Sequence, residues 1–270
     1  MKIWKNTSTL YGYDEGLTFT KNKSQAKIAL LGSKPINLVE FPNLKGIFRS
    51  GIGRDNVPEN EAIKRGIIVK YPSKKTTDII YDETASFTCG LIFRMLYNEL
   101  GSIEPWIKCD RSAISEKTLL VIGCGNIGSR VVKHMESIIH VVTYDIIKNK
   151  PSELETLIRM ADCITLHIPK ISGNDCFMNS ERLGMMKDGS VLINTARGTI
   201  VDEESLYKEI KSGRIKAAFD VFWKEPYSGK LTSLGSDQFF MTPHIASTCR
   251  QFILGCREGL DSLIMGLNHD

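Results

Sequence analysis

The sequence predicts an α/β protein in which doubly wound parallel sheets are covered by helices. Two observations lead to this fold class. Short apolar runs alternate with segments of helical periodicity along most of the 270 residues, and such β-α-β alternation is typical of parallel sheets with helices on both faces. In addition, a glycine-rich turn at residues 123–128 joins an apolar run directly to a helical segment. A chain of this length is expected to form about two domains.

Residues 1–80 are predicted to form the smaller of two α/β units. Strands are expected at residues 3–4, 26–31, 44–48 and 67–69, with a short helix over residues 58–65 that Gly66 ends.

A linker helix over residues 76–98 is predicted to follow. Asp82 or Thr84 could cap it. One of its faces carries Phe87, Leu91, Met95 and Leu96, and Gly101 and Pro105 lie beyond its end. Residues 101–116 are expected to be irregular and to lead into the larger unit.

The larger unit centres on the glycine turn. Residues 117–122 form an apolar run suited to a strand that is buried on both faces. The turn itself reads Gly123-Cys124-Gly125-Asn126-Ile127-Gly128. Ile127, Val131, Val132 and Met135 then recur at helical spacing, and a second apolar run over residues 138–144 ends in Asp145. The glycines therefore stand where a strand turns into a helix, and an acid follows the next strand.

This order of elements predicts a dinucleotide site of the Rossmann type. Gly123 permits a sharp turn, Gly125 lets a pyrophosphate approach the backbone, and Gly128 lets helix and strand pack closely. The helix N-terminus offers N–H groups and a partial positive charge to the phosphates. Asp145 lies 20 residues after Gly125, where a carboxylate can accept both ribose hydroxyls and would repel a 2′-phosphate, so NAD is favoured over NADP. The alternative is a glycine turn that binds no phosphate.

The rest of the larger unit continues the alternation. Ser152 and Glu155 form a capping-box pattern for a helix over residues 154–160, and Asp202 is expected to cap a helix through Lys211. Further strands are predicted at residues 163–168, 190–194, 216–219 and 239–241, and a short helix at 180–186. Ligands of such sheets bind beyond the C-terminal strand ends. We therefore expect polar groups from residues 195–198, 220–225 and 243–244 to converge on one cleft.

A second turn that could bind an anion follows the predicted strand over residues 44–48. It reads Arg49-Ser50-Gly51-Ile52-Gly53-Arg54. Backbone N–H groups of such a turn can point outward and receive an anion, and the two arginines add positive charge. The alternative is a plain turn with two surface arginines.

Composition excludes several classes of protein. A net charge of +4 without a long basic run argues against nucleic-acid binding. No apolar run is long enough to span a bilayer, and the first residues lack the apolar core of a signal peptide. The seven cysteines contain no C-x-x-C pair, which favours free thiols in a reducing compartment over disulfides or a metal site. A cytoplasmic protein without membrane or nucleic-acid partners is expected.

Five segments together resemble a known family. MKDGSVLINTARGTIVDEESL, AAFDVFWKEP and MTPHIAS, with the GCGNIG turn and FRSGIGRDNV, are similar to signatures of the D-isomer-specific 2-hydroxyacid dehydrogenases, the family of phosphoglycerate dehydrogenase. The resemblance implies an NAD-binding Rossmann domain over residues 81–247, inserted into a smaller flavodoxin-like substrate domain made of residues 1–80 and 248–270. It also implies a homodimer through the cofactor domain.

The resemblance assigns the catalytic roles to Arg197, Glu225 and His244. Arg197 would clamp the carboxylate or carbonyl oxygen of a 2-oxo acid. His244 would give a proton to that oxygen, and Glu225 would orient the imidazolium. The implied NAD site comprises Gly123, Gly125, Asn126, Ile127, Gly128, Asp145, His167, Ile168, Pro169, Thr195, Ala196, Arg197, Asp220 and His244. The implied substrate contacts come from Arg49, Ser50, Gly51, Ile52 and Arg54.

The chain departs from the family pattern at several positions. Arg54 stands where the family mostly carries a small apolar residue, Ser86 where a glutamate is common, and Ile52 and Ile168 where residues are often polar. A second cation beside the substrate turn suggests a phosphorylated or dicarboxylic 2-oxo acid as substrate. Each catalytic residue also has a plain reading, because His244 could merely follow a strand, Arg197 could pair with a neighbour, and Glu225 could be a surface acid.

Two functions therefore compete. The first is an enzyme that reduces a 2-oxo acid to a D-2-hydroxy acid with NADH. The second is an NAD(H)-sensing binding protein like the corepressors that share this fold. The presence of Arg197, Glu225 and His244 together favours turnover.

Overall fold

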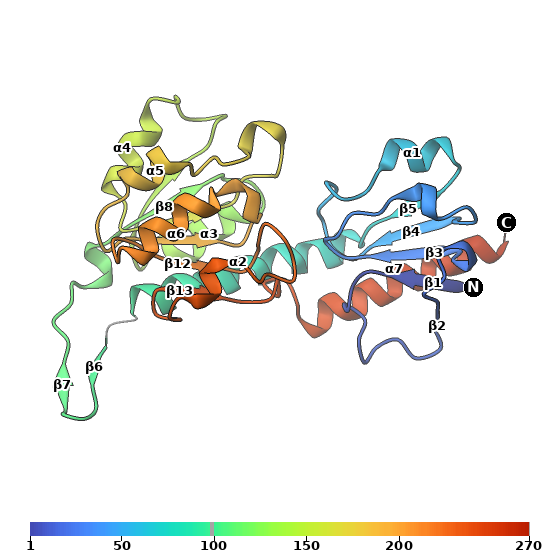
Figure 1. The fold of residues 1–270 in the computed structure, drawn as a ribbon, viewed down its shortest axis with the longest axis horizontal. Coiled ribbons are helices and arrows are strands. Elements are labelled where there is room, and N and C mark those ends of the chain that lie inside the picture. Colours follow the sequence, from blue (N-terminus) through green and yellow to red (C-terminus); the bar gives the residue numbers. More distant parts are fainter. Residues whose placement is uncertain (98–99, 270) are drawn as a thin grey trace. The chain divides into compact units, whose positions relative to one another are not determined.

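The computed structural model describes residues 1–97 and 100–269. The chain divides into two compact units. One comprises Met1–Glu83 together with Ser247–Asp270, and the other comprises Thr84–Ala246. The predicted α/β class is confirmed, because each unit contains a parallel sheet with helices packed on it (Figure 1).

The sheet of the first unit has five parallel strands in the order β2-β1-β3-β4-β5. They are β1 (Lys2–Lys5), β2 (Thr18–Phe19), β3 (Ile28–Leu31), β4 (Gly46–Arg49) and β5 (Ile68–Lys70). Counted along the chain this is the 2-1-3-4-5 order of flavodoxin-like sheets. The prediction of a flavodoxin-like α/β unit is thereby confirmed, and β2 is a strand that sequence analysis did not anticipate.

Helices cover both faces of this sheet. Side chains of β3 alternate between the two faces, since Ile28 and Leu30 pack with α7 (Arg250–His269), whereas Ala29 and Leu31 pack with α1 (Glu59–Lys64). Both faces of β3 are buried, so its sequence is a continuous apolar run and does not alternate between apolar and polar residues. Each fully buried Leu or Ile contributes about 1.5–3 kcal/mol to folding.

The second unit contains a six-stranded parallel sheet in the order β13-β12-β11-β10-β8-β9. Its strands are β8 (Thr118–Ile122), β9 (His140–Tyr144), β10 (Cys163–Leu166), β11 (Val191–Asn194), β12 (Lys216–Phe219) and β13 (Phe239–Met241). One face packs on α2 (Lys74–Leu96) and α3 (Gly128–Met135). The other packs on α4 (Glu153–Met160), α5 (Ser180–Met185) and α6 (Glu203–Lys211). This is the predicted doubly wound arrangement.

The linker helix begins earlier than predicted. Helix α2 starts at Lys74, and Asp82 and Thr84 lie inside it rather than at its cap. The Ser73 hydroxyl oxygen accepts the N–H of Thr76 at 3.2 Å, so the serine satisfies an N–H group of the first turn. The predicted last residue, Asn98, lies outside the described residues.

The predicted capping box of α4 is wrong. Ser152 has helical backbone angles and its side chain caps nothing. Instead, the Glu153 carboxylate accepts the Lys150 N–H at 2.9 Å and the Asn149 side-chain amide at 2.9 Å. The loop before the helix folds back on the carboxylate, which a pattern of Ser and Glu three residues apart does not reveal.

Residues 101–116 are more regular than predicted. Strands β6 (Gly101–Ser102) and β7 (Ile107–Lys108) pair antiparallel as a short hairpin that projects from its unit (Figure 1). Gly101 has φ +97°, and a Cβ there would lie 2.1 Å from the Ile107 carbonyl oxygen, so only glycine fits at this pairing. The remaining predicted helices and strands are confirmed, with small differences at their ends.

Candidate active site

The candidate site lies where the strand order of the second unit reverses. Strand β8 has β9 on one side and β10 on the other. The connection that follows β8 therefore runs to one side of it, and the connection that follows β9 crosses to the other side. A doubly wound sheet binds its ligand in the crevice outside the strand ends at such a point. The glycine turn follows β8, and the loops with Arg197, Glu225 and His244 follow β11, β12 and β13.

The three glycines of the turn have the properties that a dinucleotide site needs. Gly123 has φ +91°, which L side chains rarely adopt. At Gly128 a Cβ would lie 1.9 Å from the Gly123 carbonyl oxygen, so helix and strand can approach only without a side chain. At Gly125 a Cβ would meet no atom within 4 Å. Protein packing therefore leaves the backbone of Gly125 open on the side where the sequence predicts a pyrophosphate.

The N-terminus of α3 has no side-chain cap of its own. Ile127 precedes the helix and caps nothing. The carbonyl oxygens of Gly125 and Asn126 accept hydrogen bonds from the Ser129 hydroxyl and the Arg130 guanidinium, at 2.7 and 2.6 Å. Because these carbonyl oxygens are already hydrogen-bonded and no side chain caps the helix, the N–H groups and the partial positive charge at the start of α3 are suited to bind an anion.

Asp145 is held beside the glycine turn. Its carboxylate accepts the Ile147 N–H at 2.9 Å and the Cys124 N–H at 2.8 Å. These two bonds, the Ile147 bond first, lower the pKa of Asp145, so the group is ionised at neutral pH. Each oxygen keeps a second lone pair that can accept a ribose hydroxyl.

His167 follows β10 and lies against the glycine turn. Its carbonyl oxygen would be 2.7 Å from a Cβ at Gly123, and Ile168 lies on the same side. Burial lowers the pKa of His167 to about 4, so the ring is neutral at pH 7, and its Nε2 lies 3.0 Å from the Thr165 hydroxyl. Pro169 is exposed. A neutral, half-buried ring of this kind is suited to line a site rather than to transfer protons.

The Arg197 loop is shaped by Asn194, a residue that sequence analysis missed. Asn194 is fully buried, and its side chain accepts the Ala196 N–H at 3.0 Å and donates to the Arg197 carbonyl at 2.9 Å. Asparagine at a strand end is a turn signal that could have indicated this role. The Arg197 side chain donates to the Ala196 carbonyl at 2.8 Å. The neighbouring Thr195 hydroxyl lies 2.9 Å from that of Thr88 in α2, so its side chain is turned to the helix.

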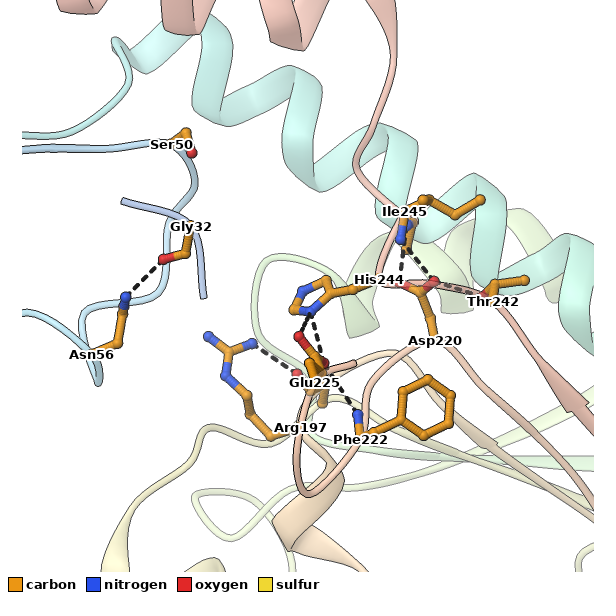
Figure 2. Close-up of polar contacts among 12 residues, drawn as sticks. Gly32, Ser50, Asn56, Arg197, Asp220, Phe222, Glu225, Thr242, His244 and Ile245 are labelled. Atoms are coloured by element: carbon orange, nitrogen blue, oxygen red, sulfur yellow. Dashed lines mark hydrogen bonds and ion pairs between the residues drawn. The ribbon is translucent and has the colours of Figure 1, made fainter. Parts of the chain in front are cut away.

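Glu225 and His244 form a close pair. Both carboxylate oxygens of Glu225 lie 2.9–3.0 Å from Nδ1 of His244 (Figure 2). Glu225 also accepts the Phe222 N–H at 3.2 Å. Figure 2 shows the Arg197 guanidinium extending toward the same region as the imidazole ring. With Nδ1 occupied by the carboxylate, Nε2 is the nitrogen that His244 can present to a ligand.

Asp220 organises the backbone around His244. It is fully buried, and its carboxylate accepts the Thr242 hydroxyl at 2.6 Å and the N–H groups of Ile245 and Ala246 at 2.9 Å (Figure 2). Burial raises the pKa of Asp220, while these hydrogen bonds oppose the rise. The predicted contact of Asp220 with a cofactor would therefore come in addition to three internal bonds.

In the first unit, the turn after β4 is held from within. Arg49, Ser50 and Asn56 are 6%, 5% and 6% exposed. The Arg49 guanidinium donates to the carbonyl of Gly53 and to the Asn56 side chain, at 3.1 and 3.2 Å. The Ser50 hydroxyl donates to the Leu31 carbonyl at 2.8 Å, and Asn56 donates to the Gly32 carbonyl at 2.7 Å (Figure 2). The side chains of Arg49 and Ser50, predicted to contact substrate, thus have an internal role.

Arg54 carries its own counter-charge. Its guanidinium forms an ion pair with Glu59 at 3.2 Å and lies 4.4 Å from the centre of the Tyr71 ring. The Tyr71 hydroxyl donates to the same carboxylate. The predicted second cation beside the substrate turn is therefore ion-paired within its own unit, with 68% of its side chain exposed.

The second unit combines a glycine turn of the cofactor-binding type, the ionised Asp145 after the next strand, and the Glu225–His244 pair. This combination is typical of a nicotinamide-dependent oxidoreductase. The family model described as "D-isomer specific 2-hydroxyacid dehydrogenase, NAD binding domain" matches residues 103–246. The chain belongs to this family, and it is an NAD-dependent oxidoreductase of the D-2-hydroxyacid dehydrogenase type. The predictions of the family and of NAD as cofactor are confirmed.

Individual members of the family are similar to this chain over most of its length. It is 33% identical over 225 residues to hydroxypyruvate reductase of Thermotoga maritima, a match that covers 76% of this chain and 72% of the relative. It is 34% identical over 229 residues to glyoxylate reductase of Thermofilum pendens, covering 76% of this chain and 66% of that enzyme. Among solved structures, D-lactate dehydrogenase of Aquifex aeolicus with NAD and lactic acid superposes with a TM-score of 0.80 at 24% identity, covering 100% and 96% of the two chains.

Two features are absent from the described parts of the chain. No helix among residues 1–97 and 100–269 combines the length and apolar character needed to cross a membrane. Over the same ranges, no three His, Cys, Asp or Glu side chains gather as a metal site would require. All seven cysteines are free thiols, of which Cys89, Cys163 and Cys256 are buried.

Proposed function

We propose that this protein reduces a small 2-oxo acid to its D-2-hydroxy acid with NADH, and that Arg197, Glu225 and His244 carry the reaction. The observation that supports this proposal best is the pairing of both Glu225 oxygens with Nδ1 of His244 at 2.9–3.0 Å. A carboxylate in this position fixes the ring through Nδ1 and leaves Nε2 to face a ligand, which a proton donor at Nε2 requires.

The residues would share the work as follows. NADH, when bound, supplies the hydride that reaches carbon 2 of the substrate. Arg197 clamps the substrate oxygens and polarises the carbonyl bond with its planar guanidinium. Nε2 of His244 gives its proton to the carbonyl oxygen, which becomes the hydroxyl group, and takes the proton back in the oxidative direction. Glu225 keeps the ring oriented and compensates the positive charge.

The described residues fit the cofactor. Gly123, Gly125 and Gly128 shape a turn with an open backbone at the start of α3, where Asn126 and Ile127 can face a pyrophosphate. Asp145 is ionised and can accept ribose hydroxyls. The groups His167, Ile168, Pro169, Thr195, Ala196 and Asp220 complete the proposed NAD site.

We place a monoanionic 2-oxo acid, such as glyoxylate, pyruvate or hydroxypyruvate, ahead of a phosphorylated or dicarboxylic one. A second anionic group would have to pair with Arg54. The Arg54 guanidinium is already paired with Glu59 at 3.2 Å, with 68% of its side chain exposed, and it lies 4.4 Å from the centre of the Tyr71 ring. In the substrate turn, the backbone of Gly51 and Ile52 would then receive a single carboxylate.

The first prediction tests turnover. NADH absorbance is followed with glyoxylate, pyruvate, hydroxypyruvate and oxaloacetate, using the wild type and His244→Ala. We expect the wild type to reduce at least one monoanionic acid faster than oxaloacetate. His244→Ala should lose about 10²–10⁴-fold in kcat, since general acid catalysis typically contributes this much, while it should still bind NADH.

This experiment also separates the enzyme from a binding protein that senses NAD(H). NADH binding without turnover on any acid would favour the sensor. An unchanged kcat in His244→Ala would show that another group donates the proton. Faster reduction of oxaloacetate than of the monoanionic acids would remove the substrate proposal alone.

We also propose that the protein is a homodimer formed through the second unit. The segment around the hairpin of β6 and β7 exposes four large apolar side chains, Leu100, Ile103, Trp106 and Ile107, of which Trp106 is 79% exposed. Such a group on a projecting hairpin is costly in water and is typical of a protein interface. A second copy of this chain is the proposed occupant.

A further inference from the structure

The Arg197 and Glu225 loops touch each other at a glycine. Gly198 is buried and directly follows Arg197. A Cβ at this position would lie 2.1 Å from the carbonyl carbon of Phe222 and 2.4 Å from the backbone nitrogen of Trp223. Its φ is not in the left-handed region, so the glycine is needed for space and not for conformation. The two loops therefore pack backbone against backbone.

The residue whose carbonyl group Gly198 contacts, Phe222, also bonds the catalytic carboxylate through its N–H. The N–H of Phe222 donates to Oε1 of Glu225 at 3.2 Å, and that oxygen lies 3.0 Å from Nδ1 of His244 (Figure 2). On the following residue, the indole N–H of Trp223 donates to the Val201 carbonyl at 2.7 Å. The backbone of Phe222, with its carbonyl group against Gly198 and its N–H on Glu225, thus influences where Glu225, and then His244, can lie.

A third aromatic residue, Tyr227, packs against the side chains of Phe222 and Trp223. The Tyr227 ring stacks on Phe222 with ring centres 4.8 Å apart and an angle of 18° between planes, and it lies 5.9 Å from Trp223. Its hydroxyl donates to Glu203, the first residue of α6, at 2.7 Å. The Glu225 loop is consequently tied to the segment that follows Arg197 at three points, namely Gly198, Val201 and Glu203.

We propose that the backbone of Phe222 and Trp223, packed on Gly198 and held by Tyr227, is the positioning element that sets the Glu225–His244 pair relative to Arg197. The inference rests on the proposed function of these three residues. A methyl group at residue 198 forces the peptide to move by about 1 Å, since ordinary contacts of a Cβ begin near 3.4 Å. Misplacement of about 1 Å can cost about 10²-fold in rate.

The test compares Gly198→Ala with Gly184→Ala. Gly184 lies in α5 of the same unit, and a Cβ there meets no atom within 4 Å. We expect Gly198→Ala to lower kcat by about 10²-fold with an unchanged Kd for NADH, and Gly184→Ala to match the wild type. Tyr227→Ala should lower kcat in the same direction, whereas Tyr227→Phe, which keeps the stacked ring and loses only the hydroxyl bond to Glu203, should lose less than Tyr227→Ala.

A second readout does not depend on turnover. The Nδ1 proton of His244, bonded to Glu225, is observed by proton NMR and assigned by its loss in His244→Ala. This signal should shift or vanish in Gly198→Ala and in Tyr227→Ala, but persist in Gly184→Ala. If Gly198→Ala does not fold, Tyr227→Ala carries both measurements. Wild-type kcat and an unshifted Nδ1 signal in the folded variants would overturn the proposal, while absence of turnover in the wild type would count against the proposed function alone.

Discussion

At the scale of single residues, His244 shows how buried groups maintain an unusual conformation. Its φ of +56° lies in the left-handed region, which costs a non-glycine residue about 1–2 kcal/mol. Asp220 offsets this cost, because its buried carboxylate accepts the two N–H groups that follow the histidine. Strain of this kind persists only where the surroundings fix it, and it is common at active sites.

His167 should make the free energy of unfolding depend on pH. Burial lowers its pKa to about 4, whereas the unfolded chain has a value of about 6.5. The unfolded state therefore binds the proton more readily, and stability falls as the pH drops from about 6.5 towards about 4. Between pH 7 and pH 5 this group should cost about 2 kcal/mol of unfolding free energy. Urea unfolding of His167→Gln at both pH values should lack this part of the loss.

The control for this measurement is His134→Gln, because His134 is exposed on α3. That variant should follow the wild type at both pH values. Parallel pH dependence of the wild type and His167→Gln would show that His167 is not the buried neutral ring inferred from its surroundings.

At the scale of elements, α6 illustrates a cap that sequence could identify. The Asp202 carboxylate accepts the Ser205 N–H at 2.7 Å, and bonds from Ser205 lower its pKa. Asp202→Ala should reduce the free energy of unfolding by about 1 kcal/mol at pH 7. Because the pKa is lowered on folding, this contribution is present above the unfolded value of about 3.9 and is lost as the pH falls through the folded value.

Asp202→Asn is the matched variant for the cap, since asparagine also accepts the N–H bond. In urea unfolding it should retain most of the stability that Asp202→Ala loses. Equal stability of Asp202→Ala and the wild type would contradict the capping role. At the start of α4 the predicted capping box of Ser152 does not form. There the Lys150 N–H of the preceding loop donates to the Glu153 carboxylate instead.

At the scale of the whole molecule, the exposed hairpin predicts the state of assembly. Replacing both Ile103 and Trp106 with Ser should weaken a dimer by about 3 kcal/mol or more, or about 100-fold in Kd, given the value of burying two large apolar side chains. Analytical ultracentrifugation across a dilution series measures this change. The control is Tyr11→Ser, an equally exposed residue of the other unit. A wild type that sediments as a monomer at every concentration would refute the proposed dimer.

The sequence by itself determined the fold class, the order of strands and helices along the second unit, and the position of the glycine turn. These follow from local periodicity and from the glycines of the turn, since Gly123 has φ +91° and Gly128 leaves no room for a Cβ. The same local signals failed where partners come from distant parts of the chain. The predicted caps of α2, Asp82 and Thr84, lie inside the helix, and the local signals do not indicate the hairpin that follows it.

Tertiary structure decided the arrangement of the candidate site. The family signatures named Arg197, Glu225 and His244. Only packing shows that Asn194 shapes one loop, that Asp220 holds another, and that Gly198 contacts the backbone of Phe222, whose N–H bonds Glu225. The physical reason is that hydrogen bonds and close contacts depend on which strand ends lie next to each other in the sheet. Neighbours in space, such as Gly198 and Phe222, carry no mark of one another in the sequence.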